Sequence, residues 1–232
     1  MKHIGIAGCS AEGAALCYRT ICQEGSQFLK EHDHPEVSVH TFSLAHYMEV
    51  LDKQGWEGVG RLMADSATKL SRAGAEFVVC PDNTVHQAFD LAASLSPIPW
   101  LHIADAITQE AVNRKYRRIA VFGTRWLMEG PVYADKFAAA EIESVIPADG
   151  DREKIKTIIF SELVKGQLKP ASRRYFSGLI DQMRDQGCDA VVLGCTEIPL
   201  LVRQVDSALP IFDSTRMLAR TALKHAVGCE LP

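Results

Sequence analysis

Two residues that can carry protons lie at corresponding points of an internal repeat. The segment GAEFVVCPDNT at residues 74–84 aligns without a gap with GCDAVVLGCTE at residues 187–197, at a constant offset of 113 residues. Asp82 and Cys195 occupy the same column of this alignment, and each follows an apolar run typical of a buried strand. Carboxyl and thiol groups both serve as general acids or bases. The repeat therefore indicates two similar structural units, each with one proton-transfer group.

Opposed acid and base groups suit the inversion of a carbon that bears an acidic hydrogen. One group removes the proton from one face, the other delivers a proton to the opposite face, and backbone donors stabilise the carbanion-like charge. The residues that follow the two groups are expected to begin helices: Asn83 and Thr84 in the first half, Thr196 and Glu197 in the second. Helix N-termini bind carboxylates and lower the pKa of a thiol from about 8.5. We therefore predict that these four residues contact the substrate while the carboxyl and thiol groups move its proton.

Strands that alternate with helices are needed to hold these groups, and the sequence predicts that alternation. Apolar residues recur at helical spacing between β-rich runs, as at Val59 and Met63 in the first half and at Phe176 and Ile180 in the second. This pattern is typical of parallel sheets built from β-α-β units. The turn at residues 148–151 is expected to be a loop. The predicted strands cover residues 3–8, 37–44, 75–80, 100–103, 118–123, 190–194 and 210–213.

The repeat extends beyond the segments that hold the two reactive groups. Residues 4–8 resemble residues 119–123, and residues 98–100 resemble residues 209–211. The two halves of the chain therefore look like copies of one unit.

We predict an α/β protein of two pseudosymmetric three-layer αβα domains with parallel sheets. Residues 1–104, joined by a C-terminal helix at 214–232, form the first domain, and residues 105–213 form the second. Ligands of such folds lie beyond the carboxyl ends of the strands. The active site is therefore expected in the cleft between the two domains.

Composition and charge exclude several classes of function. The formal net charge of −4 is spread along the chain and gives no basic stripe for nucleic acid. No run approaches the roughly 18 apolar residues of a membrane span, and the first residues lack a signal-peptide pattern, so we expect a cytoplasmic protein with a small-molecule partner. The seven cysteines include no CxxC pair, so neither a disulfide framework nor a zinc site is expected.

Several motifs carry a resemblance to a known family. The stretch LGCTEIPLL at 193–201 resembles the second catalytic cysteine motif of the aspartate/glutamate racemase superfamily, most closely its amino-acid racemase branch. The stretch GTRWLMEGPVY at 123–133 resembles the segment that opens the second half of those proteins. The resemblance covers nearly the full length. It implies a pseudosymmetric two-domain isomerase that needs no pyridoxal phosphate and no metal, and that is usually a homodimer.

The resemblance also places further residues near the substrate. Lys165, in ELVKGQL at 162–168, lies where a lysine of the family meets a substrate carboxylate. Ser10 matches a substrate-side loop, and Thr124 lies at the equivalent place in the second half, although each is also a good helix N-cap. Arg125 is either a partner of a carboxylate or an exposed side chain. Residues around 43–55 and 124–133 are expected to be loops that set specificity.

Asp82 departs from the family pattern. The stretch PDNTVH at 81–86 falls where the family has a Cys-Asn-Thr motif, so Asp82 replaces the first catalytic cysteine. An aspartate has an unperturbed pKa near 3.9 and is a carboxylate at pH 7, unlike a largely protonated thiol. As an anion it would repel a substrate that already carries two carboxylates. We therefore predict either a raised pKa at Asp82 or a substrate less anionic than aspartate.

The main prediction is a cofactor-independent amino-acid racemase of the aspartate/glutamate type, which inverts Cα by proton transfer between Asp82 and Cys195. Two alternatives stay open. Loss of one thiol also suits a one-sided proton donor, as in a decarboxylase or a cis/trans isomerase of small carboxylic acids. The second alternative is a non-catalytic small-molecule-binding protein, against which the intact context of Cys195 argues.

Overall fold

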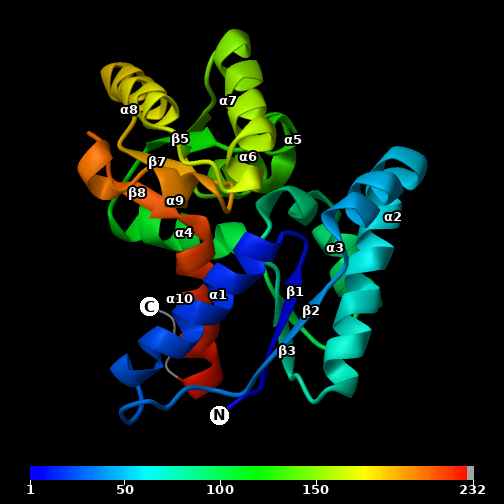
Figure 1. Cartoon of the computed structure of the whole chain (residues 1–232). Helices are drawn as coiled ribbons and strands as arrows, with labels where there is room; N and C mark the ends of the chain where they lie inside the picture. The colour runs from blue at the N-terminus through cyan, green and yellow to red at the C-terminus, as the bar shows by residue number, and fades with distance from the viewer. Residues whose placement is uncertain (229–232) are drawn as a thin grey trace. The chain divides into compact units, whose positions relative to one another are not determined.

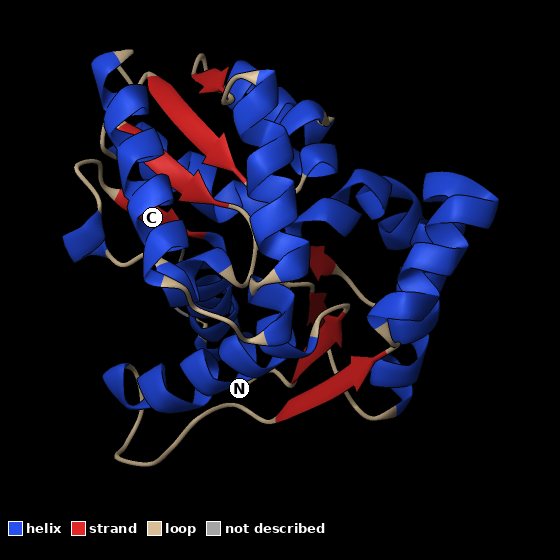
Figure 2. Ribbon diagram, turned by 45° about the horizontal axis from the view of Figure 1, so that its top comes forward, coloured by secondary structure: helices blue, strands red, loops and turns tan. Residues whose placement is uncertain are grey.

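The computed structural model describes residues 1–228, which form two parallel sheets of four strands each (Figure 1, Figure 2). The first sheet has the order β2-β1-β3-β4 and the second has the order β6-β5-β7-β8, so the two sheets share one topology. The predicted α/β class with two parallel sheets is confirmed. The strands are β1 (Ile4–Gly8), β2 (Val37–Thr41), β3 (Phe77–Val79), β4 (Trp100–Leu101), β5 (Arg118–Phe122), β6 (Glu143–Val145), β7 (Ala190–Leu193) and β8 (Ile211–Asp213).

Helices flank both sheets, as the β-α-β pattern predicts. No helix within residues 1–228 combines the length and the apolar character that a membrane span requires. The α-helices are α1 (Ala11–Glu24), α2 (Leu44–Arg72), α3 (Phe89–Leu95), α4 (Ile103–Asn113), α5 (Arg125–Glu129), α6 (Pro131–Ala139), α7 (Asp149–Ser161), α8 (Pro170–Asp185), α9 (Ile198–Leu201) and α10 (Ser214–Val227). Four short 3₁₀ helices are η1 (Gly25–Gln27), η2 (Asn83–Ala88), η3 (Leu163–Lys165) and η4 (Gln204–Asp206) within the described residues.

Four segments differ from the sequence prediction. Strand β6 was not predicted, because it has only three residues and begins with an exposed glutamate at the sheet edge. The expected loop at 148–151 is wrong, since α7 begins at Asp149, and Asp149 and Asp151 favour the first turn through the helix dipole. The expected loops at 43–55 and 124–133 are mostly helical, because they contain the first part of α2 together with α5 and much of α6.

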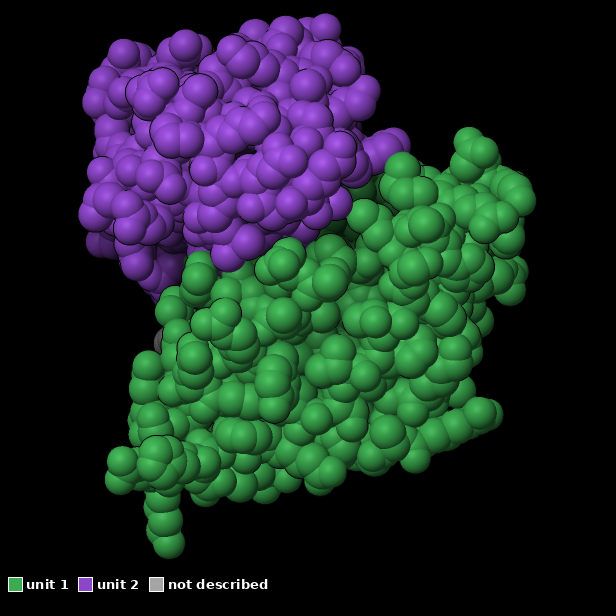
Figure 3. Space-filling model, viewed as in Figure 1, with its two compact units in different colours: residues 1–106, 215–232 green, residues 107–214 purple. Residues whose placement is uncertain are grey.

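The chain divides into two compact units, coloured separately in Figure 3. The first unit comprises residues 1–106 and 215–232, and the second comprises residues 107–214. Helix α10 belongs to the first unit, where Arg220 pairs with Glu24 at the end of α1 at 2.7 Å. The predicted helix at 214–232 is observed as Ser214–Val227, while residues 229–232 lie outside the described residues.

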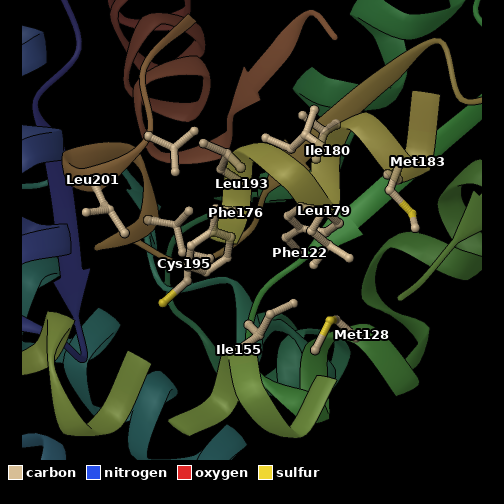
Figure 4. Packing of buried hydrophobic residues seen from close by; sticks show 14 of the residues in the cluster. Phe122, Met128, Ile155, Phe176, Leu179, Ile180, Met183, Leu193, Cys195 and Leu201 are labelled. Carbon is tan, nitrogen blue, oxygen red and sulfur yellow. The ribbon is translucent and has the colours of Figure 1, made fainter. Parts of the chain in front are cut away.

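Each unit has its own apolar core. In the second unit the aromatic rings of Phe122 and Phe176 pack between the sheet and α8, together with the aliphatic side chains drawn in Figure 4. In the first unit, side chains from α2, α3 and the ends of β1 and β3 pack together, and a second cluster includes Ala7, Leu70 and Val78. Two separate cores are the physical counterpart of the sequence repeat.

Candidate active site

Asp82 lies just past the carboxyl end of β3 and bonds to the backbone of the loop that follows β1. The two strands pair in parallel, with Ile6 opposite Val79, so their carboxyl ends are adjacent. The Cys9 N–H donates to Asp82 Oδ2 at 2.8 Å, and the Ser10 N–H lies 3.2 Å from both carboxylate oxygens. The topology of the sheet therefore brings a carboxylate and two backbone donors to one point.

Helix α1 begins directly after these two donors. Ser10 is its N-cap, with extended backbone angles and a side-chain oxygen that accepts from the Gly13 N–H at 3.2 Å. Gly8 permits the tight entry, because a Cβ there would lie 2.6 Å from Thr41 Cγ2 and 2.8 Å from Ala14 Cβ. The Asp82 carboxylate therefore lies beside the N-terminus of a 14-residue helix, where N–H donors and the helix dipole both favour its ionised form.

The negative charge of Asp82 acts on the buried thiols around it. Burial, followed by the charge of Asp82, raises the pKa of the Cys17 thiol to about 12. The same two causes, in the same order, hold the pKa of Cys80 well above its usual value. Burial is also the main cause of the raised pKa of Tyr47, to which Cys80, Cys9 and Asp82 add. Cys17 and Cys80 are therefore protonated core residues.

Cys195 lies just past the carboxyl end of β7, at the equivalent place in the second sheet. Its thiol donates to Glu197 Oε2 at 2.9 Å, and both side chains are buried. Figure 4 shows Cys195 beside Phe176, with its sulfur directed away from Phe122 and Leu179. Helix α9 begins only at Ile198 and has four residues, so its dipole contributes little at the sulfur. The thiol is therefore governed by the neighbouring carboxylate rather than by a helix N-terminus.

Two glycines let the loop after β5 approach the loop that holds Cys195. The Gly194 N–H donates to the Phe122 carbonyl oxygen at 2.7 Å, and a Cβ at Gly194 would lie 2.5 Å from Leu127 Cδ2. A Cβ at Gly123 would likewise lie 3.1 Å from the Gly194 carbonyl oxygen. Thr124 caps α5 with a side-chain oxygen that accepts from the Leu127 N–H at 3.2 Å. The second unit thus repeats the arrangement of the first: the loop that carries the helix N-cap residue lies beside the loop that carries the proposed proton-transfer residue.

The other predicted site residues differ in exposure. Asn83 and Thr196 are buried, and Thr84 is half-buried. Lys165 is exposed at the end of η3, where Gly166 adopts the left-handed conformation with φ of 71°. Ser10 and Thr124 both act as helix N-caps, which is the structural alternative raised for them. Contact of these six residues with a substrate stays a prediction.

Arg125 is occupied by side chains of its own unit. Its guanidinium lies 2.9 Å from Glu129, 2.7 Å from Asp149 and 3.5 Å from Glu153. The hydrogen bond to Glu129 and the charge of Asp149 raise its pKa further. These contacts join α5 to α7. Arg125 thus pairs with carboxylates of the protein itself while 38% of its side chain stays exposed, so both readings describe it in part.

His86, one turn beyond Asp82, serves packing. Its Nε2 pairs with the Cys80 carbonyl oxygen at 3.0 Å, and its ring stacks on Phe89 with 5.5 Å between centroids. The His102 ring meets it edge-on at 4.7 Å. Within residues 1–228, no group of three or more His, Cys, Asp or Glu side chains is arranged to hold a metal ion.

Sequence reasoning missed the part played by Cys9. Its backbone N–H donates to Asp82 Oδ2 at 2.8 Å. Every residue except proline has such a donor, so the residue type carries no signal. The flanking Gly8 and Ser10, at the junction of strand and helix, are sequence features that mark this loop.

A model of the Asp/Glu/hydantoin racemase family matches residues 6–222 of the chain. A solved Yersinia pestis protein assigned to the Asp/Glu racemases superposes with a TM-score of 0.89 and 31% identity, covering 98% of this chain and 100% of that one. An aspartate racemase homologue from Pyrococcus horikoshii superposes with a TM-score of 0.84 and 29% identity, over 97% of this chain and 99% of that one.

Curated proteins give more distant similarity. A broad specificity amino-acid racemase of Bacillus subtilis is 22% identical over 166 residues, which is 70% of each protein. A glutamate racemase of Pseudomonas aeruginosa is 24% identical over 172 residues, which is 71% of this chain and 60% of that protein. The aligned part of this chain therefore covers between 60% and 70% of the length of these two relatives.

Proposed function

The chain belongs to the Asp/Glu/hydantoin racemase family, and we propose that it is a cofactor-independent amino-acid racemase in which Asp82 and Cys195 transfer the α-proton. The resemblance read from the sequence motifs is confirmed at the level of the family, and relatives point to an isomerase of the racemase type. The observation that carries the proposal is that equivalent positions of the two sheets hold a carboxylate and a thiol, each with a hydrogen-bonding partner.

The hydrogen bonds indicate the starting protonation of each group. Backbone donors favour the carboxylate form of Asp82, so Asp82 begins as the base. The Cys195 thiol donates to Glu197, and a neighbouring carboxylate disfavours a second anion, so Cys195 begins as the acid. The resting enzyme therefore acts first on the enantiomer whose α-hydrogen Asp82 removes.

The reaction then proceeds by two proton transfers. Asp82 takes the α-proton, the C–H bond breaks, and its electron pair stays on the carbon next to the substrate carboxylate. The Cys195 S–H bond breaks as its proton passes to the opposite face, which leaves a thiolate and the inverted amino acid. The protonated Asp82 and the thiolate now have the protonation needed for the other enantiomer, so the same groups catalyse the reverse reaction.

The remaining predicted residues are proposed to bind the substrate. Lys165 offers an exposed ammonium for the α-carboxylate, and Glu197 acts through the thiol. Residues of the loops after the central strands supply hydroxyl, amide and backbone groups: Ser10, Asn83, Thr84, Thr124 and Thr196. Family resemblance further suggests a homodimer and a reaction without pyridoxal phosphate.

Hydrogen exchange at Cα tests the proposal directly. The enzyme is incubated in heavy water with a panel of D- and L-amino acids, and deuterium incorporation is followed by NMR together with chiral chromatography. We expect exchange with at least one amino acid, and a fall of at least ~100-fold in Asp82→Asn and Cys195→Ala, because general acid and base groups typically contribute 10²–10⁴-fold. Chelation by EDTA and omission of pyridoxal phosphate should leave the rate unchanged.

Cys188→Ala is the matched control for the loss of a thiol. Cys188 is also buried in the second unit, but it precedes β7 and so lies at the opposite end of that strand from Cys195, away from the proposed reacting groups. Its variant should retain at least half of the wild-type exchange rate. Equally slow exchange in all four proteins would exclude the proposed pair, and release of carbon dioxide from a malonate-type substrate without exchange would favour the decarboxylase alternative.

A further inference from the structure

We infer that Asp82 makes this enzyme selective for amino acids whose side chains carry no negative charge, an inference that rests on the proposed racemase function. Two alternatives follow from the sequence for an aspartate at this position: a carboxyl group that is protonated, or a substrate that is less anionic than aspartate. The contacts of Asp82 distinguish these alternatives.

The Asp82 carboxylate occupies two backbone donors at a helix N-terminus. Cys9 and Ser10 present two N–H groups at the N-terminus of α1, which is the kind of place where a free carboxylate binds. Both N–H groups are already directed at the Asp82 carboxylate, at 2.8 and 3.2 Å. An anion-binding position that a substrate carboxylate would otherwise use is therefore filled by a side chain of the protein. The same contacts favour the ionised form, so the protonated alternative is disfavoured.

A substrate at the proposed site meets the negative charge of Asp82. The field of Asp82 reaches its neighbours, since it contributes to the raised pKa of Cys17, Cys80 and Tyr47. The other proton-transfer residue, Cys195, has a buried carboxylate of its own at 2.9 Å, from Glu197. A substrate that reaches both groups therefore encounters two acidic side chains.

The charge of the substrate side chain determines how strongly these acidic groups repel it. A neutral amino acid brings one ammonium and one carboxylate, whereas aspartate or glutamate brings a second carboxylate that like charges repel. Arg125, a candidate to offset this charge, already bonds to Glu129 and Asp149. Like charges repel at close range where water is partly excluded, and screening by salt reduces the effect. We expect discrimination of at least ~10-fold.

Pairs of nearly isosteric amino acids measure this discrimination in the wild-type enzyme. The kcat/KM for Cα deuterium exchange is compared for L-asparagine against L-aspartate and for L-glutamine against L-glutamate, at low ionic strength. We expect the amides to exchange at least ~10-fold more efficiently. Exchange that favours the acids, or that does not distinguish them, would overturn the inference while leaving the racemase proposal intact. Absence of exchange with every amino acid of the panel would instead overturn the racemase proposal.

Binding to the Asp82→Asn variant tests whether this side chain causes the selectivity. Binding is measured because the variant lacks the proposed base and should not turn over the substrate. Calorimetric titration should show that L-aspartate binds Asp82→Asn at least ~10-fold more tightly than it binds wild type, while the affinity for L-asparagine changes by less than ~3-fold. Asp90→Asn is the control, since Asp90 is an exposed aspartate of the same unit and its variant has the same net charge. An unchanged ratio of the two affinities in Asp82→Asn would overturn the inference, and the wild-type comparison decides the matter if that variant does not fold.

Discussion

Asp82 and Cys195 occupy equivalent positions in the two sheets, but their hydrogen bonds run in opposite directions. Asp82 accepts from the backbone of Cys9 and Ser10, which stabilises negative charge, whereas Cys195 donates to the carboxylate of Glu197, which opposes it. The repeat thus supplies two equivalent places, and under the proposed function Asp82 acts there as the base and Cys195 as the acid. Glu197 is the residue whose replacement tests this division most directly.

Replacing Glu197 by Gln should make the Cys195 thiol easier to ionise and should slow hydrogen exchange at Cα of the substrate. Without the neighbouring negative charge, the Cys195 thiolate forms more readily, so alkylation of Cys195 by iodoacetamide should begin at a lower pH than in wild type. The exchange rate at Cα should fall about 10- to 100-fold, because the carboxylate no longer holds the thiol as a proton donor. Peptide mapping by mass spectrometry at a series of pH values follows Cys195 separately from the other cysteines.

Glu162→Gln is the control for that measurement. Glu162 also accepts a hydrogen bond from a side chain of the second unit, from Ser172 at 2.6 Å, and its pKa is lowered chiefly by that bond. Its replacement should leave the alkylation of Cys195 unchanged. Identical alkylation profiles for Glu197→Gln and wild type would show that the 2.9 Å contact does not control the thiol.

Among the elements, helix α2 illustrates how one residue changes a structure that periodicity describes well. The spacing of Val59 and Met63 predicts the helix, and both residues are buried. Gly55 interrupts it, with φ of 62° and ψ of −160°, a conformation that is essentially restricted to glycine. Residues 44–54 are thus a separate helical segment, capped by Ser43, rather than the loop expected from the sequence.

Two glycine substitutions with opposite expected effects test this interpretation. Gly55→Ala should lower the free energy of unfolding by about 1–3 kcal/mol, because the backbone is strained for alanine although no atom lies within 4 Å of the added Cβ. Gly178→Ala, at an exposed and open position inside α8, should raise it by about 0.5–1 kcal/mol. Urea unfolding measures both. Stabilisation by Gly55→Ala would indicate that α2 can run straight through this position.

The same elements show what the sequence could and could not predict. Seven strands, the repeat and the places of Asp82 and Cys195 follow from apolar runs and their spacing, which are properties of residue type. Strand β6 could not be predicted from its own residues, because three residues at a sheet edge show almost no pattern. Its counterpart β2 in the repeat would have indicated it. The hydrogen bond from Cys9 to Asp82 could not be predicted, because its donor is a backbone N–H.

At the scale of the whole chain, the last helix ties the C-terminal residues to the first unit. Leu218 and Leu223 on α10 are fully buried, and Arg220 pairs with Glu24 of α1. Near the other end, the Lys2 N–H donates to the Ala226 carbonyl oxygen at 2.9 Å, and Lys2 Nζ lies 3.0 Å from His225 Nε2. The first unit is therefore completed by residues from both ends of the described chain.

The contact between Lys2 and His225 should make the free energy of unfolding depend on pH below neutrality. Burial, followed by the charge of Lys2, lowers the pKa of His225 in the folded protein, so its neutral ring can accept from Lys2 and pack edge-on against Phe77 at 4.7 Å. In the unfolded chain a histidine has a pKa near 6.5. The unfolded state therefore binds more protons, and the contribution of His225 is fully present above pH ~6.5 and is lost as the pH falls below it.

The expected loss is modest, because His225 is partly exposed. We expect His225→Gln to reduce the fall in the free energy of unfolding between pH 7.5 and 5.5 by about 0.2–1 kcal/mol, the range of exposed charge pairs. Part of the fall should remain, since burial and Lys69 also lower the pKa of His40. Urea unfolding followed by circular dichroism gives the values. His32→Gln, which replaces a highly exposed histidine, should show the same pH dependence as wild type. A steeper fall of the free energy of unfolding in His225→Gln would show that protonated His225 stabilises the folded protein.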